Sequence, residues 1–121
     1  YHLTGARGLA LSGYDIVLLD GINKLKDFTK ILDFETSCIL LLFYYISILD
    51  DTNIVNRTNF ETLKEIQILC KNLYEENIKS LSKEKIRNEM SKLNDIFIEK
   101  NISAGGSADL LILTIFIYFI K

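Results

Sequence analysis

The clearest signal along the chain is a helical spacing of apolar residues in its second half. Between residues 58 and 76, apolar side chains recur every three or four positions, as on the buried face of an amphipathic helix. The same spacing returns between residues 84 and 97. The sequence therefore predicts two amphipathic helices. Their expected inward residues are Phe60, Leu63, Ile66, Cys70 and Leu73 in the first helix, and Ile86, Met90, Leu93 and Phe97 in the second, with Glu84, Lys85, Glu89 and Lys92 outside.

Two runs of apolar residues stand beside these amphipathic stretches. Cys38–Leu49 and Leu110–Ile120 carry no charged residue, and both are shorter than the roughly 18 residues needed to span a membrane. We interpret each run as a helix buried on most sides. The β-branched residues of the second run would also suit a buried strand. Its length and a capping residue before it favour a helix over Ala108–Ile120.

Glycines and short polar residues place the remaining elements. Gly5–Asp20 is predicted as the first helix, with Gly21 as its end. A short amphipathic piece, Leu25–Leu32, leads to a second long helix over about Glu35–Leu49. Asp50–Asn53 then interrupts the pattern with side chains that prefer turns.

Capping signals place the third helix and the connection that follows it. Thr58 and Glu61 have the spacing of a capping box, so the third helix is predicted to begin there. Asn77–Ser82 is predicted to connect it to the fourth helix. The whole pattern predicts an all-α fold of about five helices in an orthogonal or bundle-like array, with two strongly apolar buried helices.

Composition supports a folded helical domain and excludes some partners. The 121 residues are 49% hydrophobic and 25% charged, which suits one domain, residues 1–121, with a real core. Proline is absent, which favours helices joined by short loops. The net charge of −2, with no basic stripe, gives no case for nucleic acid.

Cysteine and histidine offer no catalytic or metal-binding pattern. Cys38 and Cys70 lie in apolar segments without a CxxC motif, so we expect core thiols of a cytoplasmic protein. His2 is the only histidine and supports neither a metal site nor a catalytic triad.

Ser103–Leu111 is the most informative stretch for function. Gly105 and Gly106 leave their N–H groups uncovered, and Ser107 is expected to cap the helix that follows, with Asp109 in its first turn. The N–H groups and positive dipole end of such a helix favour an anion, so we predict a phosphate-binding helix start. The alternative is a plain loop in which Asp109 only complements the helix dipole.

Three separated segments resemble one family. Gly5-Ala6-Arg7-Gly8 with Ser12-Gly13-Tyr14 resembles its Gly-x-Arg-Gly-Glu-Ala-x-Ser-Gly-Phe segment. Asp51-Thr52-Asn53 with Arg57 resembles its Asp-Thr/Ser-Asn…Arg-Gly-Gly segment, and Ser103–Leu111 resembles its Ser-Pro-Gly-Gly-Ser-Ala-Asp-Leu-Leu signature. The family is triphosphoribosyl-dephospho-CoA synthase, the CitG-like enzymes that make the precursor of the citrate lyase prosthetic group. The chain resembles their C-terminal portion.

The resemblance implies transfer of the triphosphoribosyl group of ATP to 3'-dephospho-CoA, with release of adenine. The product would be 2'-(5''-triphosphoribosyl)-3'-dephospho-CoA. Leu9 stands where the family has glutamate, Thr58-Asn59 where it has Gly-Gly, and Ala104 where it has proline. The loss of the glutamate bears most on activity, because it removes a carboxylate that could hold a metal or an arginine.

The reaction needs a held triphosphate and a carboxylate near the sugar. Mg²⁺, backbone N–H groups and arginine side chains serve the first need, and a base or electrostatic partner serves the second. Asp51 and Asp109 are the candidate catalytic and Mg²⁺-binding residues, with their roles left open. The candidate phosphate- and nucleotide-binding residues are Arg7, Gly8, Asn53, Arg57, Gly105, Gly106 and Ser107.

Two other functions remain open from the sequence. A non-catalytic helical module would self-associate, as a homo-oligomer, through apolar surface that is exposed where the rest of a longer protein is missing. A hydrolytic nucleotide-binding domain would share the phosphate loop but release phosphate in place of adenine.

Overall fold

Five α-helices make up the part of the chain that the structure, a computed structural model, describes. It describes the backbone of residues 5–50 and 59–120 and the side chains of residues 16–50 and 59–120. No strand occurs in these ranges, so the all-α prediction is confirmed. The helices are α1 (Gly5–Phe28), α2 (Phe34–Ile48), α4 (Phe60–Ser80), α5 (Lys83–Lys100) and α6 (Gly105–Ile120).

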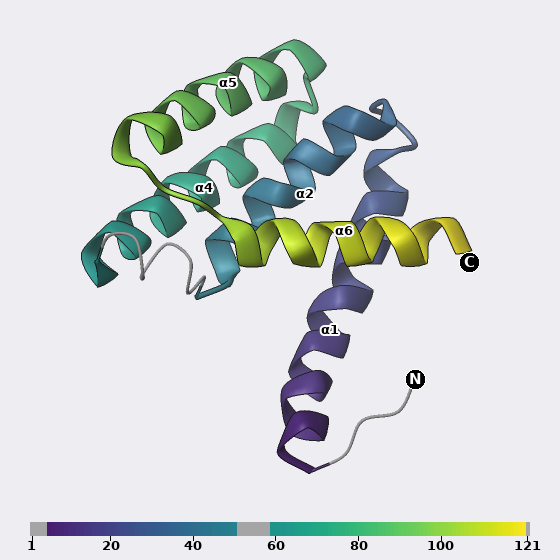
Figure 1. Ribbon diagram of the computed structural model, residues 1–121. Coiled ribbons are helices and arrows are strands. Elements are labelled where there is room, and N and C mark those ends of the chain that lie inside the picture. Colours follow the sequence, from purple (N-terminus) through teal and green to yellow (C-terminus); the bar gives the residue numbers. More distant parts are fainter. Residues whose placement is uncertain (1–4, 51–58, 121) are drawn as a thin grey trace.

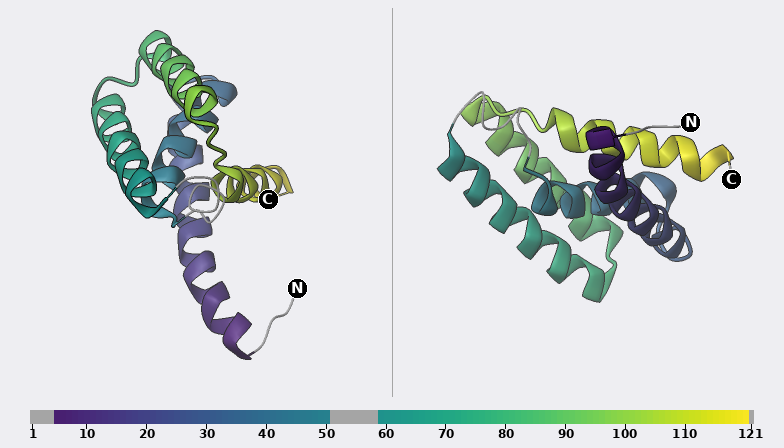
Figure 2. Two further views of the ribbon diagram at one scale, coloured as in Figure 1. Left: turned by 60° about the vertical axis from the view of Figure 1, so that its left-hand side comes forward. Right: turned by 90° about the horizontal axis from the view of Figure 1, so that it is seen from below.

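Helix α2 is the centre of the arrangement and packs against each of the other four helices. Helices α4 and α5 run antiparallel on one side of it, and α6 crosses α2 and α1 (Figures 1 and 2). This position follows from the sequence of α2, which is apolar around most of its circumference and has its single acidic residue, Glu35, in the first turn.

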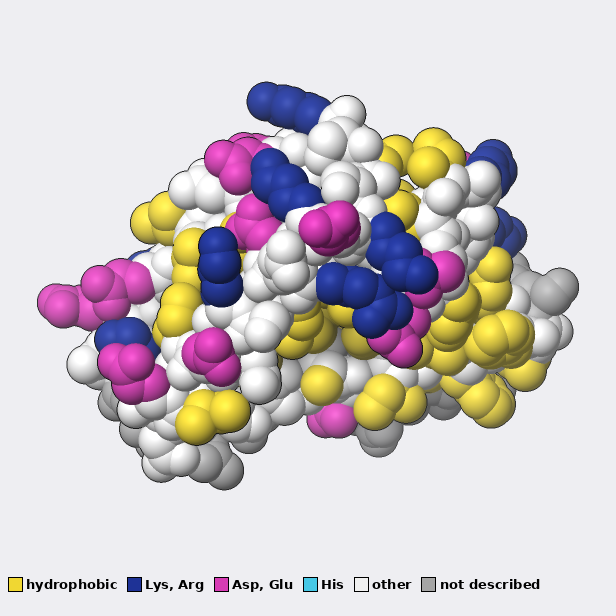
Figure 3. Space-filling model, turned by 90° about the horizontal axis from the view of Figure 1, so that it is seen from above, with side chains coloured by type: hydrophobic (Ala, Val, Ile, Leu, Met, Phe, Trp, Pro, Cys, Tyr) yellow, Lys and Arg dark blue, Asp and Glu magenta, His cyan; other side chains and the backbone are white. Residues whose placement is uncertain are grey.

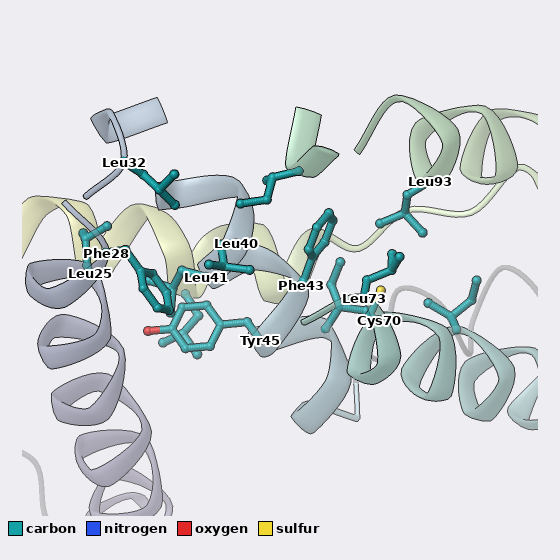
Figure 4. Close-up of a cluster of buried hydrophobic side chains, with 14 of the residues drawn as sticks. Leu25, Phe28, Leu32, Leu40, Leu41, Phe43, Tyr45, Cys70, Leu73 and Leu93 are labelled. Carbon is teal, nitrogen blue, oxygen red and sulfur yellow. The ribbon is translucent and has the colours of Figure 1, made fainter. Parts of the chain in front are cut away.

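The hydrophobic core gathers around α2 (Figure 4). Leu40, Leu41, Phe43 and Tyr45 are fully buried on this helix. The predicted inward faces of the amphipathic helices are confirmed in most positions. Buried residues that reach the core from the neighbouring elements are Leu25, Phe28 and Leu32, then Leu63, Ile66, Cys70 and Leu73, then Ile86 and Leu93, and finally Ile102 and Leu110.

The first helix does not end at Gly21, as the sequence predicts, but continues to Phe28. The reason is a close contact with α2: a Cβ built on Gly21 would overlap the hydroxyl of Tyr45. Gly21 is therefore a packing residue inside a helix, where it lets two helices approach. The predicted separate piece at Leu25–Leu32 becomes the last turn of α1 and a turn closed by the N–H of Leu32 bonded to the carbonyl of Phe28, at 2.8 Å.

The start of α4 also differs from the prediction. Its N-cap is Asn59, whose side chain accepts a hydrogen bond from the N–H of Thr62 at 2.8 Å, and Thr58 lies outside the described residues. Phe60 is 57% exposed and does not join the inward face. It is the first residue of α4 and lies outside the core cluster. Lys64 Nζ lies 5.0 Å from the centroid of its ring.

The connection between α4 and α5 is shorter than the predicted Asn77–Ser82. Helix α4 runs to Ser80, and buried Asn77 donates its Nδ2 hydrogen to the carbonyl of Leu73 at 2.7 Å. Leu81 takes a left-handed conformation with φ of 48°, and Ser82 caps α5. A two-residue turn therefore sets α5 antiparallel to α4.

Helix α6 differs most from expectation, because only one side of it is buried. Ser107, Leu110 and Thr114 lie inside, whereas several large apolar side chains of the same helix are exposed. The prediction of two buried apolar helices thus holds for α2 and is wrong for α6. No helix in the described ranges is long and apolar enough to cross a membrane.

A shared polar contact fixes where α6 crosses α2. The hydroxyl of Thr114 donates to the carbonyl of Leu110 at 2.7 Å, and the hydroxyl of Tyr45 lies 2.6 Å from Thr114 Oγ1. Because the Thr114 proton is already used, Tyr45 is the donor in this second bond. Tyr45 thus donates a hydrogen bond to α6, while the hydroxyl end of its ring packs against Gly21 of α1.

Candidate functional site

The predicted phosphate site lies at the N-terminus of α6, which the end of α5 positions. Asn101 is left-handed, with φ of 54°, and its N–H bonds to the carbonyl of Ile98 at 3.2 Å. The N–H of Ile102 bonds to the carbonyl of Phe97 at 2.8 Å, and the Ile102 side chain is buried. These are the bonds of a Schellman motif, which reverses the chain and directs it into Ser103 and Ala104.

The helix begins earlier than predicted, at Gly105. Its first helical bond runs from the N–H of Ala108 to the carbonyl of Ala104, at 3.0 Å. Ser107 is consequently not the N-cap but a buried residue within the first turn, and Asp109 is exposed in the second turn. Both glycines adopt helical conformation and extend the helix backwards over the predicted loop.

This helix start keeps the main features of an anion site. The N–H groups of Gly105 and Gly106 have no carbonyl one turn earlier in the helix to accept them, and neither residue has a side chain that covers them. No acidic residue occupies the first turn of α6. Within the first turn, the positive end of the helix dipole therefore meets no carboxylate that would neutralise it.

A cavity of about 210 Å³ lies directly beside this helix start. Its lining is mostly apolar, with Asn94 and Ser103 as the polar side chains. Such a lining suits an uncharged ring or alkyl group better than a phosphate. The lining residues come from three helices and the loop: Leu42 and Ile46 of α2, Met90, Leu93, Asn94 and Phe97 of α5, and Ser103, Ala104, Gly105 and Ala108.

The C-terminal end of α2 belongs to the same region. Ile46 lines the cavity together with Gly105, and Figure 1 shows the end of α2 on the same side of the molecule as the start of α6. Gln67 of α4 holds the chain as it leaves α2, since its Nε2 donates to the carbonyl of Leu49 at 2.8 Å and to Asp50 Oδ1 at 3.1 Å. Asp51, Asn53 and Arg57 follow in sequence and lie outside the described residues.

The first predicted segment lies elsewhere. Arg7 and Gly8 are in the first turn of α1, and their side chains are not among those described. The N-terminal end of α1 extends away from the other helices and from the start of α6 (Figures 1 and 2). The described structure thus brings the C-terminal end of α2 and the N-terminal end of α6 together. The N-terminal end of α1 lies apart from them.

Sequence reasoning missed a second polar cluster, formed where α1 meets α2 and α4. The hydroxyl of Tyr44 donates to Asp20 Oδ2 at 2.7 Å, and Lys24 Nζ lies 3.7 Å from Asp20 Oδ1. The same ammonium lies over the ring of Tyr44, 4.6 Å from its centroid, and near that of Tyr74, at 5.7 Å. Burial, and then the bond to Asp20, raise the pKa of Tyr44. The four-residue spacing of Asp20 and Lys24 was the available signal.

Metal ligands are sparse in the described part of the chain. It contains no group of three or more histidine, cysteine, aspartate or glutamate side chains placed to hold an ion. Asp109 is a single exposed carboxylate near the helix start. A single carboxylate fits Mg²⁺ that arrives on a nucleotide, because that ion takes most of its ligands from phosphates and water.

Comparison with known proteins decides the family. A family model described as "CitG: ATP:dephospho-CoA triphosphoribosyl transferase" matches residues 1–121. The chain belongs to the CitG family. No solved structure matches the chain significantly.

Curated CitG relatives are considerably longer than this chain. A probable 2-(5''-triphosphoribosyl)-3'-dephosphocoenzyme-A synthase of Streptococcus equi subsp. equi is 32% identical over 124 residues, which cover 100% of this chain and 40% of the relative. One from Streptococcus mutans is 30% identical with the same coverage. Protein CitXG of Haemophilus influenzae is 35% identical over 118 residues, covering 96% of this chain and 24% of the relative. The chain therefore spans about 40% of the streptococcal relatives.

Proposed function

We propose that this chain contributes part of an active site that transfers the triphosphoribosyl group of ATP to 3'-dephospho-CoA. The observation that carries the proposal is the CitG match over residues 1–121. It is supported by the helix start at Gly105, where the family-like signature presents uncovered N–H groups beside a cavity. The chain spans 40% of its streptococcal relatives, so the complete activity is proposed for a protein of the relatives' full length.

The reaction is a substitution at the anomeric carbon of the ATP ribose. The bond from that carbon to the adenine nitrogen breaks, and a bond forms to a ribose hydroxyl oxygen of dephospho-CoA. The hydroxyl proton passes to a base, while adenine leaves with the electron pair of the broken bond and takes up a proton. The sugar carries positive charge in between, so a carboxylate close to it lowers the barrier.

The residues divide between holding the triphosphate and assisting the sugar. The N–H groups of Gly105 and Gly106, at the positive end of α6, would bind phosphate oxygens. Arg57 is the proposed side-chain donor to the same group, and Arg7, on the N-terminal end of α1 that extends away from this helix start, is the alternative donor. Mg²⁺ bound to the triphosphate would take one ligand from Asp109 or Asp51, and the other aspartate would act as the base.

The remaining candidate residues are proposed to assist these groups. Asn53 is proposed to add a side-chain donor or acceptor beside Asp51, and Gly8 to let the backbone approach the nucleotide next to Arg7. Ser107 is buried and would act from within the first turn of α6. The apolar cavity beside Gly105 would receive an uncharged part of one substrate, since its lining offers few donors for phosphate.

A chimera tests this function directly. This chain would replace the matching segment of the Streptococcus equi subsp. equi relative, and the purified protein would be incubated with ATP, Mg²⁺ and dephospho-CoA. We expect adenine release that requires both substrates, with a product whose mass corresponds to triphosphoribosyl-dephospho-CoA. The unaltered relative is the positive control.

Two results would contradict the proposal. A chimera with native-like helical circular dichroism that releases no adenine, alongside an active relative, would remove it. Release of phosphate without adenine would indicate a hydrolytic nucleotide-binding domain instead.

A further inference from the structure

The outward side of α6 is an unusually apolar surface. It lies opposite the buried Ser107, Leu110 and Thr114. Its residues recur every three or four positions, so they form one continuous face along the helix. This face, which we call the outer α6 face, consists of Ile112, Leu113, Phe116, Phe119 and Ile120, each between 46% and 67% exposed.

Charge distinguishes the outer α6 face from the other helix surfaces. Within Gly105–Ile120 the only charged residue is Asp109, near the beginning. The outward sides of α4 and α5 instead carry many lysines and glutamates, as water-facing helices do. Figure 3 shows charged side chains spread over the upper surface and hydrophobic ones gathered toward one edge.

The size of the outer α6 face is that of a contact surface. Five large side chains, each about half exposed or more, present on the order of 500 Å² of apolar area, at the upper end of what monomers expose. Ile16 and Leu19 of α1 are also exposed, at 69% and 55%. A stable protein interface covers about 800 Å² on each partner. The outer α6 face supplies more than half of that area in one charge-free strip.

The CitG relatives contain polypeptide that could cover this surface. The match spans 40% of the streptococcal proteins, so 60% of each lies outside it. That remainder has to pack against the matched part if the two form one enzyme. Of the described helices, α6 has the least charge on its outward side, which makes it the most favourable place for such packing.

We propose that the outer α6 face binds the polypeptide equivalent to the unmatched 60% of the streptococcal relatives. The contact would be made by apolar side chains of that polypeptide, with Phe116 at the centre of the strip. This inference depends on CitG membership and not on the proposed reaction. A second copy of this chain is the competing occupant, and the experiment distinguishes the two.

Co-expression with the unmatched part of the Streptococcus equi subsp. equi relative tests the contact. One partner carries an affinity tag, and the complex is measured by size-exclusion chromatography with light scattering. We expect an equimolar complex with the wild-type chain. Phe116→Glu should reduce the recovered complex by about tenfold or more, because a central apolar anchor is replaced by a charge.

Phe60→Glu is the matched control. Phe60 is the same residue type with a similar exposure, 57% against 61% for Phe116, but it lies on α4. A glutamate in the first turn of a helix is tolerated, so this variant should bind as well as the wild type. Circular dichroism of each variant alone checks that the helices remain folded.

The outcomes separate the possible occupants. Equal binding by both variants would overturn the proposal. So would a homodimer that depends on Phe116 and excludes the streptococcal polypeptide.

A second measurement does not need the streptococcal part as a separate soluble protein. It uses the chimera, in which both parts belong to one polypeptide. In the chimera, a thiol introduced by Phe116→Cys should react at least about tenfold more slowly with an aqueous thiol reagent than in the isolated chain, while Phe60→Cys should react equally in both. Equal rates for Phe116→Cys would overturn the proposal, whether or not the chimera releases adenine.

Discussion

Asp109 has an exposed carboxylate one turn inside α6, and its position bears on its role. A residue that complements the helix dipole is expected in the first turn, because the effect falls off quickly beyond it. Asp109 lies in the second turn, four residues after Gly105. Its position therefore weakens the dipole explanation, and its role toward a ligand stays a prediction.

Replacement of this carboxylate gives a sharp test. We expect Asp109→Asn in the active chimera to lower adenine release by at least about a hundredfold, since a catalytic or metal-binding carboxylate commonly contributes that much. The thermal midpoint should stay nearly unchanged, because the side chain is exposed and nearly isosteric. Asp95→Asn, another exposed aspartate, on α5, is the control and should retain activity. Full activity of Asp109→Asn would restrict Asp109 to a structural role.

Gly21 is a second residue whose role depends on its neighbour. Its missing side chain makes room for the buried hydroxyl of Tyr45. We expect Gly21→Ala to destabilise the fold by about 1–2 kcal/mol, because overlap in a packed core costs about 1–3 kcal/mol and the gain in helix propensity returns at most about 1. Urea unfolding measures the change.

Two comparisons check that prediction. Asn23→Ala, at an exposed site of the same helix, should be neutral or slightly stabilising. In a Tyr45→Phe background, where the hydroxyl is absent, Gly21→Ala should cost less than in the wild type. An equal cost in both backgrounds would contradict the packing explanation.

At the scale of elements, periodicity predicted most of the fold and failed where tertiary contacts decide. The stripe from Ile86 to Leu93 and the buried face of α4 could be predicted because one side of each helix is polar. Gly21 could not be recognised as helical, since the glycine signal for a helix end is the same whether or not Tyr45 packs against it. Spacing alone predicts Phe60 on the inward face, but its side chain is exposed at the N-terminal end of α4.

Helix α6 shows the opposite difficulty. After Asp109 it has no charged residue, and Thr114 is the one small polar side chain among large apolar and aromatic ones, so periodicity could not separate a buried face from an outward one. The start of the helix was also hidden, because glycines predict a loop and here adopt helical conformation. The same glycines do lie at this helix start, and the anion site there stays a prediction.

For the whole molecule, the candidate site was only partly predictable. The three family-like segments are far apart in sequence, and no spacing rule says which of them meet. The described structure joins the C-terminal end of α2 and the N-terminal end of α6 around one cavity because α2 packs against both α5 and α6. The roles of Asp51, Asn53, Arg57 and Arg7 stay predictions.

Buried cysteine thiols and tyrosine hydroxyls predict that the fold loses stability at alkaline pH. Burial raises the pKa of the Cys70 thiol from 9.0 to about 12 and that of Cys38 from 9.0 to about 11, and it also raises the pKa of Tyr44, Tyr45 and Tyr74. In each group the folded state holds its proton more tightly than the unfolded state.

The free energy of unfolding should therefore be unaffected by these groups below about pH 8 and should fall between about pH 9 and 12. Urea titrations across this range measure the effect. Replacing Cys70 by serine, whose hydroxyl does not titrate there, should make the decline shallower, and an unchanged slope would contradict the assignment to that thiol.

The meeting of Gly21, Tyr45 and Thr114 has a consequence for how such sequences can diverge. One phenol group both fills the gap beside α1 and bonds to α6. A residue larger than glycine at position 21 needs a smaller side chain than tyrosine at position 45. Thr114 then loses the hydroxyl that donates a hydrogen bond to it. Natural variants should consequently change these three sites as a set, and the angle between the first and last helices should shift wherever they do.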